Sequence, residues 1–155
     1  MGSTANIAGR LLARNIAGSQ TEYPGVLGTG VAKLPGDICA GRTGLTETAA
    51  AAEGYQTETV ISVVDDKAHY YPGAGSFIIK MVADKETHKL LGVQVLGNGA
   101  VDKITDIAVT AISLGATAEQ LASMDFAYAP PFSTAIHPFA HTVNILLNKL
   151  NGGLD

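Results

Sequence analysis

The stretch SFIIKMVADKETHKLLGVQVLG, residues 76–97, decides the fold class. Its first part alternates, with Phe77, Ile79 and Met81 on one face of an extended chain. Residues 90–97 alternate in the same way, and the polar residues 84–89 between the two parts are typical of a turn. The stretch therefore predicts an antiparallel β-hairpin with one buried face.

Upstream of the hairpin, the sequence predicts two helices and three strands. The first helix covers residues 5–17, where apolar residues recur at helical spacing, and Gly18 ends it. After a polar linker over 19–25, two short apolar stretches flank the turn residues Leu34-Pro35-Gly36. Thr46 is a good N-terminal cap for the second helix, which is rich in alanine. The predicted strands cover residues 26–31, 37–42 and 59–64, and the second helix covers residues 47–53.

Downstream of the hairpin, the pattern becomes helical. An apolar stripe at helical spacing begins at residue 101 and ends before Gly115. Thr117-Ala118-Glu119-Gln120 fits a capping box for a short helix, and a last helix runs from about residue 138 to 150. Grouped strands followed by grouped helices indicate an α+β fold, in which helices cover one face of an antiparallel sheet.

Composition narrows the kinds of partner. The 155 residues suit one domain; 46% are hydrophobic and only 15% are charged, well under the usual quarter. Either part of the surface is buried against another body, or the domain is simply rich in alanine. The net charge of −4 and the lack of a basic run exclude nucleic acid as a partner. No apolar run approaches the roughly 20 residues that span a bilayer, so no membrane association is predicted.

The single cysteine, Cys39, has no partner for a disulfide, which favours a cytoplasmic protein. Its neighbours Ile38 and Ala40 suit a buried structural thiol better than a nucleophile. Gly28-Thr29-Gly30 resembles a phosphate loop only faintly, because Lys33 holds the place of the third glycine of a dinucleotide fingerprint. The chain thus has no nucleotide motif of its own.

Two polar side chains near the C-terminus are candidate functional groups. His137 stands at a chain reversal before Pro138, where an imidazole either exchanges a proton or bonds locally at the start of the helix. Tyr128, beside Pro130 and Pro131, is a packing residue, a peptide-binding residue or a phenol aimed into a site. His137 and His141 share a helix face but lack a third ligand, so no metal is predicted.

Four segments in a fixed order resemble one known family. They are Ala40-Gly41-Arg42-Thr43-Gly44-Leu45-Thr46-Glu47, His69-Tyr70-Tyr71-Pro72-Gly73, Leu91-Gly92-Val93-Gln94-Val95-Leu96-Gly97 and Tyr128-Ala129-Pro130-Pro131-Phe132-Ser133. Together they resemble the C-terminal dimerisation domain of FAD-dependent pyridine nucleotide–disulfide oxidoreductases, in the branch of coenzyme A-disulfide reductases and NADH oxidases. The resemblance covers roughly residues 19 to 150.

The resemblance implies how the chain is divided. Residues 1–18 look like the last helix of the family's FAD domain, which abuts the flavin, so Ala5 and Asn6 are expected near the cofactor. Residues 19–155 would form the dimerisation domain of a homodimer. FAD and NAD(P)H would bind to upstream domains of the parent protein, and no cofactor is expected to bind tightly to this chain alone.

The resemblance also assigns roles to Tyr128 and His137. In the coenzyme A-disulfide reductase branch, the matching tyrosine reaches toward the active-site cysteine of the partner subunit. In the glutathione reductase branch, a His-Pro resembling His137-Pro138 supplies the acid–base histidine, but Thr142 replaces the glutamate that orients it. The isolated chain is expected to be inactive. The alternative hypothesis is a free-standing adaptor that binds other proteins and has no redox role.

Overall fold

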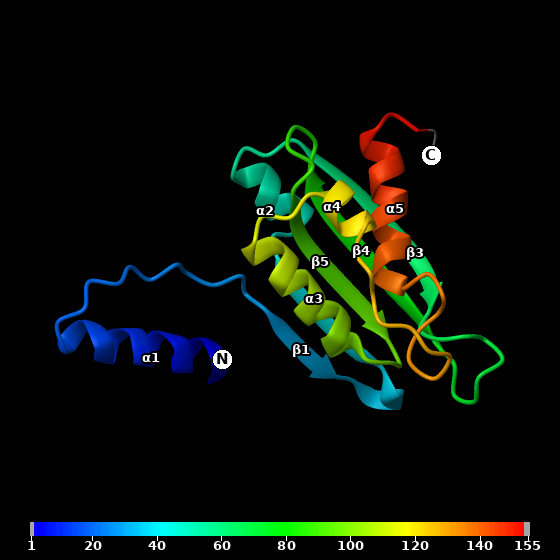
Figure 1. Ribbon diagram of the computed structural model, residues 1–155, viewed down its shortest axis with the longest axis horizontal. Helices are drawn as coiled ribbons and strands as arrows, with labels where there is room; N and C mark the ends of the chain where they lie inside the picture. The colour runs from blue at the N-terminus through cyan, green and yellow to red at the C-terminus, as the bar shows by residue number, and fades with distance from the viewer. Residues whose placement is uncertain (1, 154–155) are drawn as a thin grey trace.

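A computed structural model describes residues 2–153 as a five-stranded antiparallel sheet with helices, preceded by a separate helix (Figure 1). The strands follow the order β1-β2-β5-β4-β3 across the sheet. Their bounds are β1 Gly30–Lys33, β2 Cys39–Gly44, β3 Thr57–Asp65, β4 Ser76–Asp84 and β5 Leu90–Gly97. The helices are α1 Gly2–Ile16, α2 Glu47–Ala52, α3 Val101–Ser113, α4 Ala118–Ala122 and α5 Pro138–Leu150, with a 3-10 turn η1 at Pro35–Asp37.

The predicted hairpin of residues 76–97 is confirmed as β4 and β5, at the centre of the sheet. Ile79 lies opposite Val95, and Met81 lies opposite Val93. All four side chains are buried on one face, as the alternation predicts. The hairpin therefore supplies the floor of the hydrophobic core.

Three helices cover that face of the sheet and complete the core (Figure 1). Helix α3 packs on β2 and β5, helix α5 packs on β3 and β4, and α4 packs against α5. Their largest fully buried side chains are Ile104, Leu121, Phe139 and Leu146. The α+β fold with one helix-covered face is thus confirmed, and burying each of these side chains stabilises it by roughly 1.5–3 kcal/mol.

The opposite face of the sheet is apolar and exposed. Val63 on β3 lies opposite Ile78 on β4, which in turn lies opposite Leu96 on β5. Val63 is 72% exposed and nearby Ile61 is 65% exposed. A contiguous exposed apolar patch of this kind is typical of a surface that binds another molecule.

The prediction for the first two strands was wrong by several residues. The strands β1 and β2 begin four and two residues later than predicted, because η1 occupies Pro35–Asp37 with Asp37 at φ 60°. Leu34 N–H donates to Ile38 C=O at 2.7 Å and closes this turn. Residues 26–29 fall outside the regular pairing of β1 with β2, although Gly44 N–H still donates to Leu27 C=O at 2.9 Å. Residues 43–44 belong to the sheet because they pair with Val93 and Gly92 of β5.

Helix α1 lies apart from the sheet and its helices (Figure 1). It buries none of its residues, and its apolar side chains Ile7, Leu12 and Ile16 are exposed. An amphipathic helix gains most of its stability by packing its apolar side chains, and none of the apolar side chains of α1 is buried against the other described residues. Over residues 2–153, no helix has both the length and the apolar run that a bilayer crossing needs.

Candidate functional site

The candidate site lies at one end of the sheet, where the segment from Tyr128 to His137 passes beside the loop between β3 and β4 (Figure 1). A cavity there is lined by Asp66 and Lys67 from the loop between β3 and β4, and by Pro131 and Phe132 from the segment after Tyr128. The contact shows that sequence-distant segments meet at this end. Both predicted residues, Tyr128 and His137, belong to this end of the sheet.

Tyr128 sits on an exposed but ordered turn. Ala129 C=O accepts hydrogen bonds from Phe132 N–H at 2.8 Å and from Ser133 N–H at 3.1 Å, around the two prolines. Tyr128 is 54% exposed, and Phe132 on the same turn is 74% exposed. The prolines and the turn bonds limit the motion of this segment. Tyr128 is thus half-exposed beside a hydrogen-bonded, proline-stiffened turn.

His137 is placed very differently, inside the domain and at the first turn of α5. Its Nδ1 accepts the N–H of Phe139 at 3.2 Å, which caps the helix. Phe126 stacks on the ring with centroids 4.9 Å apart. The residue is only 5% exposed. Because Nδ1 is an acceptor, the proton of the neutral ring is on Nε2.

Burial sets the charge of His137. Desolvation of the ring, with a smaller contribution from the positive charge of Lys103, lowers the pKa of His137 to about 4. The imidazole is therefore neutral at pH 7, because burial in a low-dielectric site disfavours the charged form. In this state Nε2 is a hydrogen-bond donor, not a base.

Thr142 stands where the resemblance would place an orienting glutamate. Among the described residues, it makes no hydrogen bond to the ring of His137. Its hydroxyl lies 2.6 Å from the Ser62 hydroxyl on β3 and donates to Pro138 C=O at 3.0 Å. All of these groups are buried. Thr142 thus ties α5 to β3, and it performs a structural task instead of orienting an imidazole.

The other predicted residues lie elsewhere. Ala5 and Asn6 are exposed on α1, and the structure does not bring them to Tyr128 and His137. Cys39 is half-buried near the start of α3, beside Gly99 and Val101. Among residues 2–153 no three His, Cys, Asp or Glu side chains form a group that could hold a metal ion.

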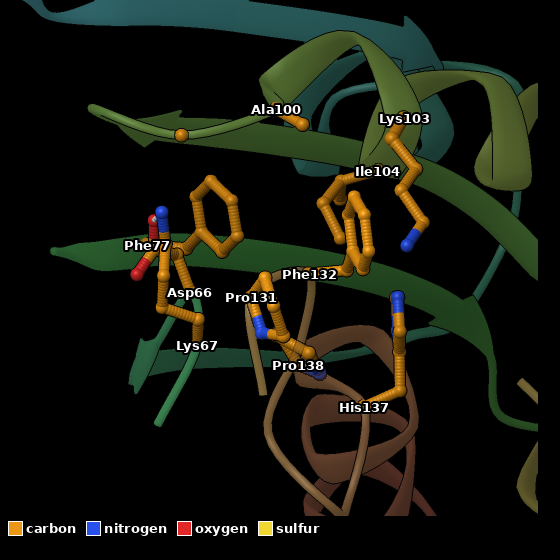
Figure 2. Close-up of a pocket in the computed structure, with 11 residues that line it drawn as sticks. Asp66, Lys67, Phe77, Ala100, Lys103, Ile104, Pro131, Phe132, His137 and Pro138 are labelled. Carbon is orange, nitrogen blue, oxygen red and sulfur yellow. Dashed lines mark ion pairs between the residues drawn. The ribbon is translucent and has the colours of Figure 1, made fainter. Parts of the chain in front are cut away.

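Lys103 is a residue of this site that sequence reasoning missed. It lies on α3 and lines the same cavity as His137, with its amino group toward the ring (Figure 2). A lysine on an amphipathic helix is usually a solvated residue, so its spacing carries no signal of this neighbour. Only the packing of α3 beside α5 brings the two side chains together.

Comparison with known proteins now adds to this geometry. The family model of the pyridine nucleotide-disulphide oxidoreductase dimerisation domain matches residues 36–140. An NAD(P)H sulfur oxidoreductase (CoA-dependent) of Pyrococcus furiosus is 41% identical over 141 residues, which are 91% of this chain and 31% of that protein. The chain thus spans about a third of the length of such relatives.

Solved structures agree with the sequence relatives. A NAD-dependent persulfide reductase from A. fulgidus superimposes with a TM-score of 0.92 at 39% identity, over 98% of this chain and 28% of that one. Reduced CoADR-RHD of Bacillus anthracis superimposes with a TM-score of 0.89 at 36% identity, over 96% of this chain and 27% of that one. These matches extend over α1 as well as the sheet domain.

Fold and relatives together define a dimerisation domain of the kind found in flavin-dependent reductases. The chain belongs to the pyridine nucleotide–disulfide oxidoreductase family, of which it is the dimerisation domain. The family resemblance of the four sequence segments is thereby confirmed. Enzymes of this family depend on FAD and NAD(P)H.

Proposed function

We propose that this domain joins two copies of a larger reductase and carries Tyr128 from each copy into the redox site of the other. The observation that supports this role is the half-exposed position of Tyr128 beside a stiff turn, combined with an exposed apolar sheet face. Tyr128 is 54% exposed, so a neighbouring subunit could reach its phenol. The parent protein would be cytoplasmic and would reduce a disulfide, persulfide, peroxide or oxygen.

The chemistry needs a proton donor beside sulfur. When a thiolate attacks a disulfide, one S–S bond forms, another breaks, and the departing thiolate is stabilised by a proton. The phenol O–H of Tyr128 can donate that hydrogen bond or proton. In the parent, bound FAD would supply electrons from NAD(P)H.

His137 has a different place in this proposal. Its Nδ1 is engaged by the N–H of Phe139 and its ring is buried, so it acts as a positioning residue. It fixes the end of the segment that begins at Tyr128. A direct acid–base role would require the ring to break the cap of α5 and turn outward.

We also infer that residues 1–18 are the terminal helix of an upstream FAD domain, with Ala5 and Asn6 near the flavin. The exposed apolar side chains of Leu12 and Ile16 lie one turn apart on helix α1 and fit an apolar neighbour. The small side chain of Ala5 would allow close approach to the cofactor.

The homodimer gives the first test. Analytical ultracentrifugation of the full-length parent is expected to give twice the mass of one chain, without dissociation at micromolar concentration. The physical reason is that an exposed apolar face of this kind gains roughly 25 cal/mol for each Å² it buries. A monomer at these concentrations would contradict the proposal.

The role of Tyr128 gives the second test. In the full-length parent, Tyr128→Phe is expected to slow reduction of the disulfide substrate by about 100-fold, the lower range for loss of an acid–base group. Stopped-flow reduction of the flavin by NAD(P)H should keep its rate, because Tyr128 acts only on the partner's sulfur chemistry. Tyr55→Phe, at a half-exposed tyrosine after α2, is the matched control and should leave both steps unchanged. If Tyr128→Phe behaves like this control, Tyr128 is a packing residue.

A further inference from the structure

The cavity beside His137 has a volume of about 130 Å³ and lies between the starts of α3 and α5 (Figure 2). Its walls come from five parts of the chain: the loop after β3, β4, the start of α3, the turn after Tyr128 and the start of α5. The side chains that line it are therefore held by several different elements. Such a cavity is built by the fold and does not depend on one flexible loop.

Two hydrogen-bond donors face one end of this cavity without an acceptor. His137 offers Nε2–H, since its Nδ1 is already occupied by the helix cap. Lys103 offers its ammonium group from the opposite wall, and Figure 2 shows a ring nitrogen of His137 directed toward it. Within residues 2–153, neither Nε2 of His137 nor the Lys103 ammonium has a hydrogen-bond or ion-pair partner.

Both donors are open to an acceptor in the cavity. The His137 residue is 5% exposed, yet its Nε2 is not one of the fully enclosed polar atoms that lack a partner, and Lys103 is half-buried. The positive charge of Lys103 also disfavours protonation of the ring. An acceptor oxygen in the cavity would satisfy both donors at once.

The remaining walls of the cavity determine which kind of ligand could bring that acceptor oxygen. Its middle is apolar, formed by Phe77, Ile104 and Phe132. At the far end stands the carboxylate of Asp66, which already accepts Gly75 N–H at 2.8 Å and lies 3.7 Å from the Lys67 ammonium. Because Lys67 pairs with that carboxylate and the middle of the cavity is apolar, the free donors lie at one end only. A ligand with one charged group and an apolar tail therefore fits better than a compact phosphate, which would leave the apolar surface uncovered.

We propose that this cavity is a binding site for a small monocarboxylate, with its carboxylate between Lys103 and His137 and its short apolar tail against Phe77, Ile104 and Phe132. A cavity of about 150 Å³ is large enough for benzene. A volume of 130 Å³ therefore suits a carboxylate with a tail of a few carbon atoms. The assignment rests on the chain's own side chains and does not depend on the parent's activity.

A bound carboxylate would also brace the segment that carries Tyr128. Phe132 and Pro131 line the cavity four and three residues after Tyr128. With the ligand in place, this turn is anchored to α3 through Lys103 and to α5 through His137. The site thus couples a small metabolite-like anion to the exposed turn.

The test is titration of the chain with butyrate, followed through the imidazole nitrogens in long-range ¹H–¹⁵N NMR spectra. The chain has four histidines, so their signals can be assigned individually. A saturable shift is expected for His137 alone, together with nuclear Overhauser contacts from the butyrate methyl group to Phe77 and Phe132. Butyramide, n-butylammonium and inorganic phosphate at matched ionic strength should each bind at least about tenfold more weakly, because they lack the charge, reverse it or lack the apolar tail.

A charge-removing variant locates the site. Lys103→Met keeps the apolar stem and removes the ammonium, so butyrate affinity should fall about tenfold or more. Lys85→Met, at an exposed lysine that pairs with Glu58, is the matched control and should bind butyrate as the unaltered chain does. Circular dichroism checks that both variants fold. The proposal is overturned if butyrate gives no saturable shift at His137, if phosphate binds as well as butyrate, or if Lys103→Met retains the affinity.

Discussion

Replacing Gly92 with alanine is expected to destabilise the domain by about 3 kcal/mol or more, the upper range for overpacking a core. Gly92 lies on β5, where a Cβ atom would come within 1.8 Å of Leu45 C=O and 2.9 Å of Leu45 N. The obstacle is backbone, which cannot rotate away as a side chain does. Leu45 N–H is also bonded to Leu91 C=O at 2.8 Å, so a shift of this segment would break the junction between β5 and α2.

Gly75→Ala is the matched control for this experiment. A Cβ atom at Gly75 would meet only the Asn98 side chain at 3.6 Å, which is ordinary van der Waals contact. We expect its stability to stay within about 0.5 kcal/mol of the unaltered chain. Urea denaturation followed by circular dichroism measures both variants. Equal midpoints for the two would show that β5 and Leu45 separate easily, contrary to the close approach in the structure.

Strict local patterns account for the parts of the fold that sequence predicts well. The hairpin of 76–97 follows from alternation that one buried face enforces on both strands. The short helix α4 follows from its capping box, in which Thr117 and Gln120 exchange side-chain and backbone hydrogen bonds. The capping box joins residues three apart, and the hairpin joins two strands that follow each other in the chain. Local sequence therefore suffices.

The first strand was misplaced because its position depends on a partner. Apolar residues 26–31 suit a strand, yet pairing starts at Gly30 because β2 and the turn at Pro35–Asp37 fix the register. In the candidate site, too, one feature follows from local sequence and another depends on packing. The exposed turn at Tyr128 follows from its prolines, whereas the burial of His137 depends on Phe126 and on Lys103 of α3. Those contacts form only when α3 and α5 pack on the sheet.

As the pH falls, the domain is expected to lose stability through His137 before the carboxylates of the domain become protonated. The pKa of His137 is lowered from 6.5 to about 4 in the folded chain. Between these two pH values the unfolded chain binds a proton that the folded chain does not, so stability is full above pH 6.5 and falls as the pH approaches 4. Each pKa unit corresponds to about 1.4 kcal/mol, so the shift from 6.5 to about 4 gives a loss of at most about 3.5 kcal/mol.

His137→Asn separates this effect from acid denaturation in general. Asparagine retains an oxygen acceptor for the helix cap but does not titrate, so the variant should lose the decline of stability between pH 6.5 and about 4.5. Asp84 is a competing group, because the hydrogen bond from the Thr87 hydroxyl holds its pKa below the usual 3.8. Its contribution is lost only at lower pH, and it is common to both proteins.

The matched control is His141→Asn, at an exposed histidine one turn further along α5. Urea midpoints measured from pH 7.5 to 4.5 should decline in this variant as steeply as in the unaltered chain. A decline that survives in His137→Asn would mean that the ring is not held neutral by burial. In that case the ring would be free to take up a proton near neutral pH, and a direct acid–base role would replace the positioning role proposed for it.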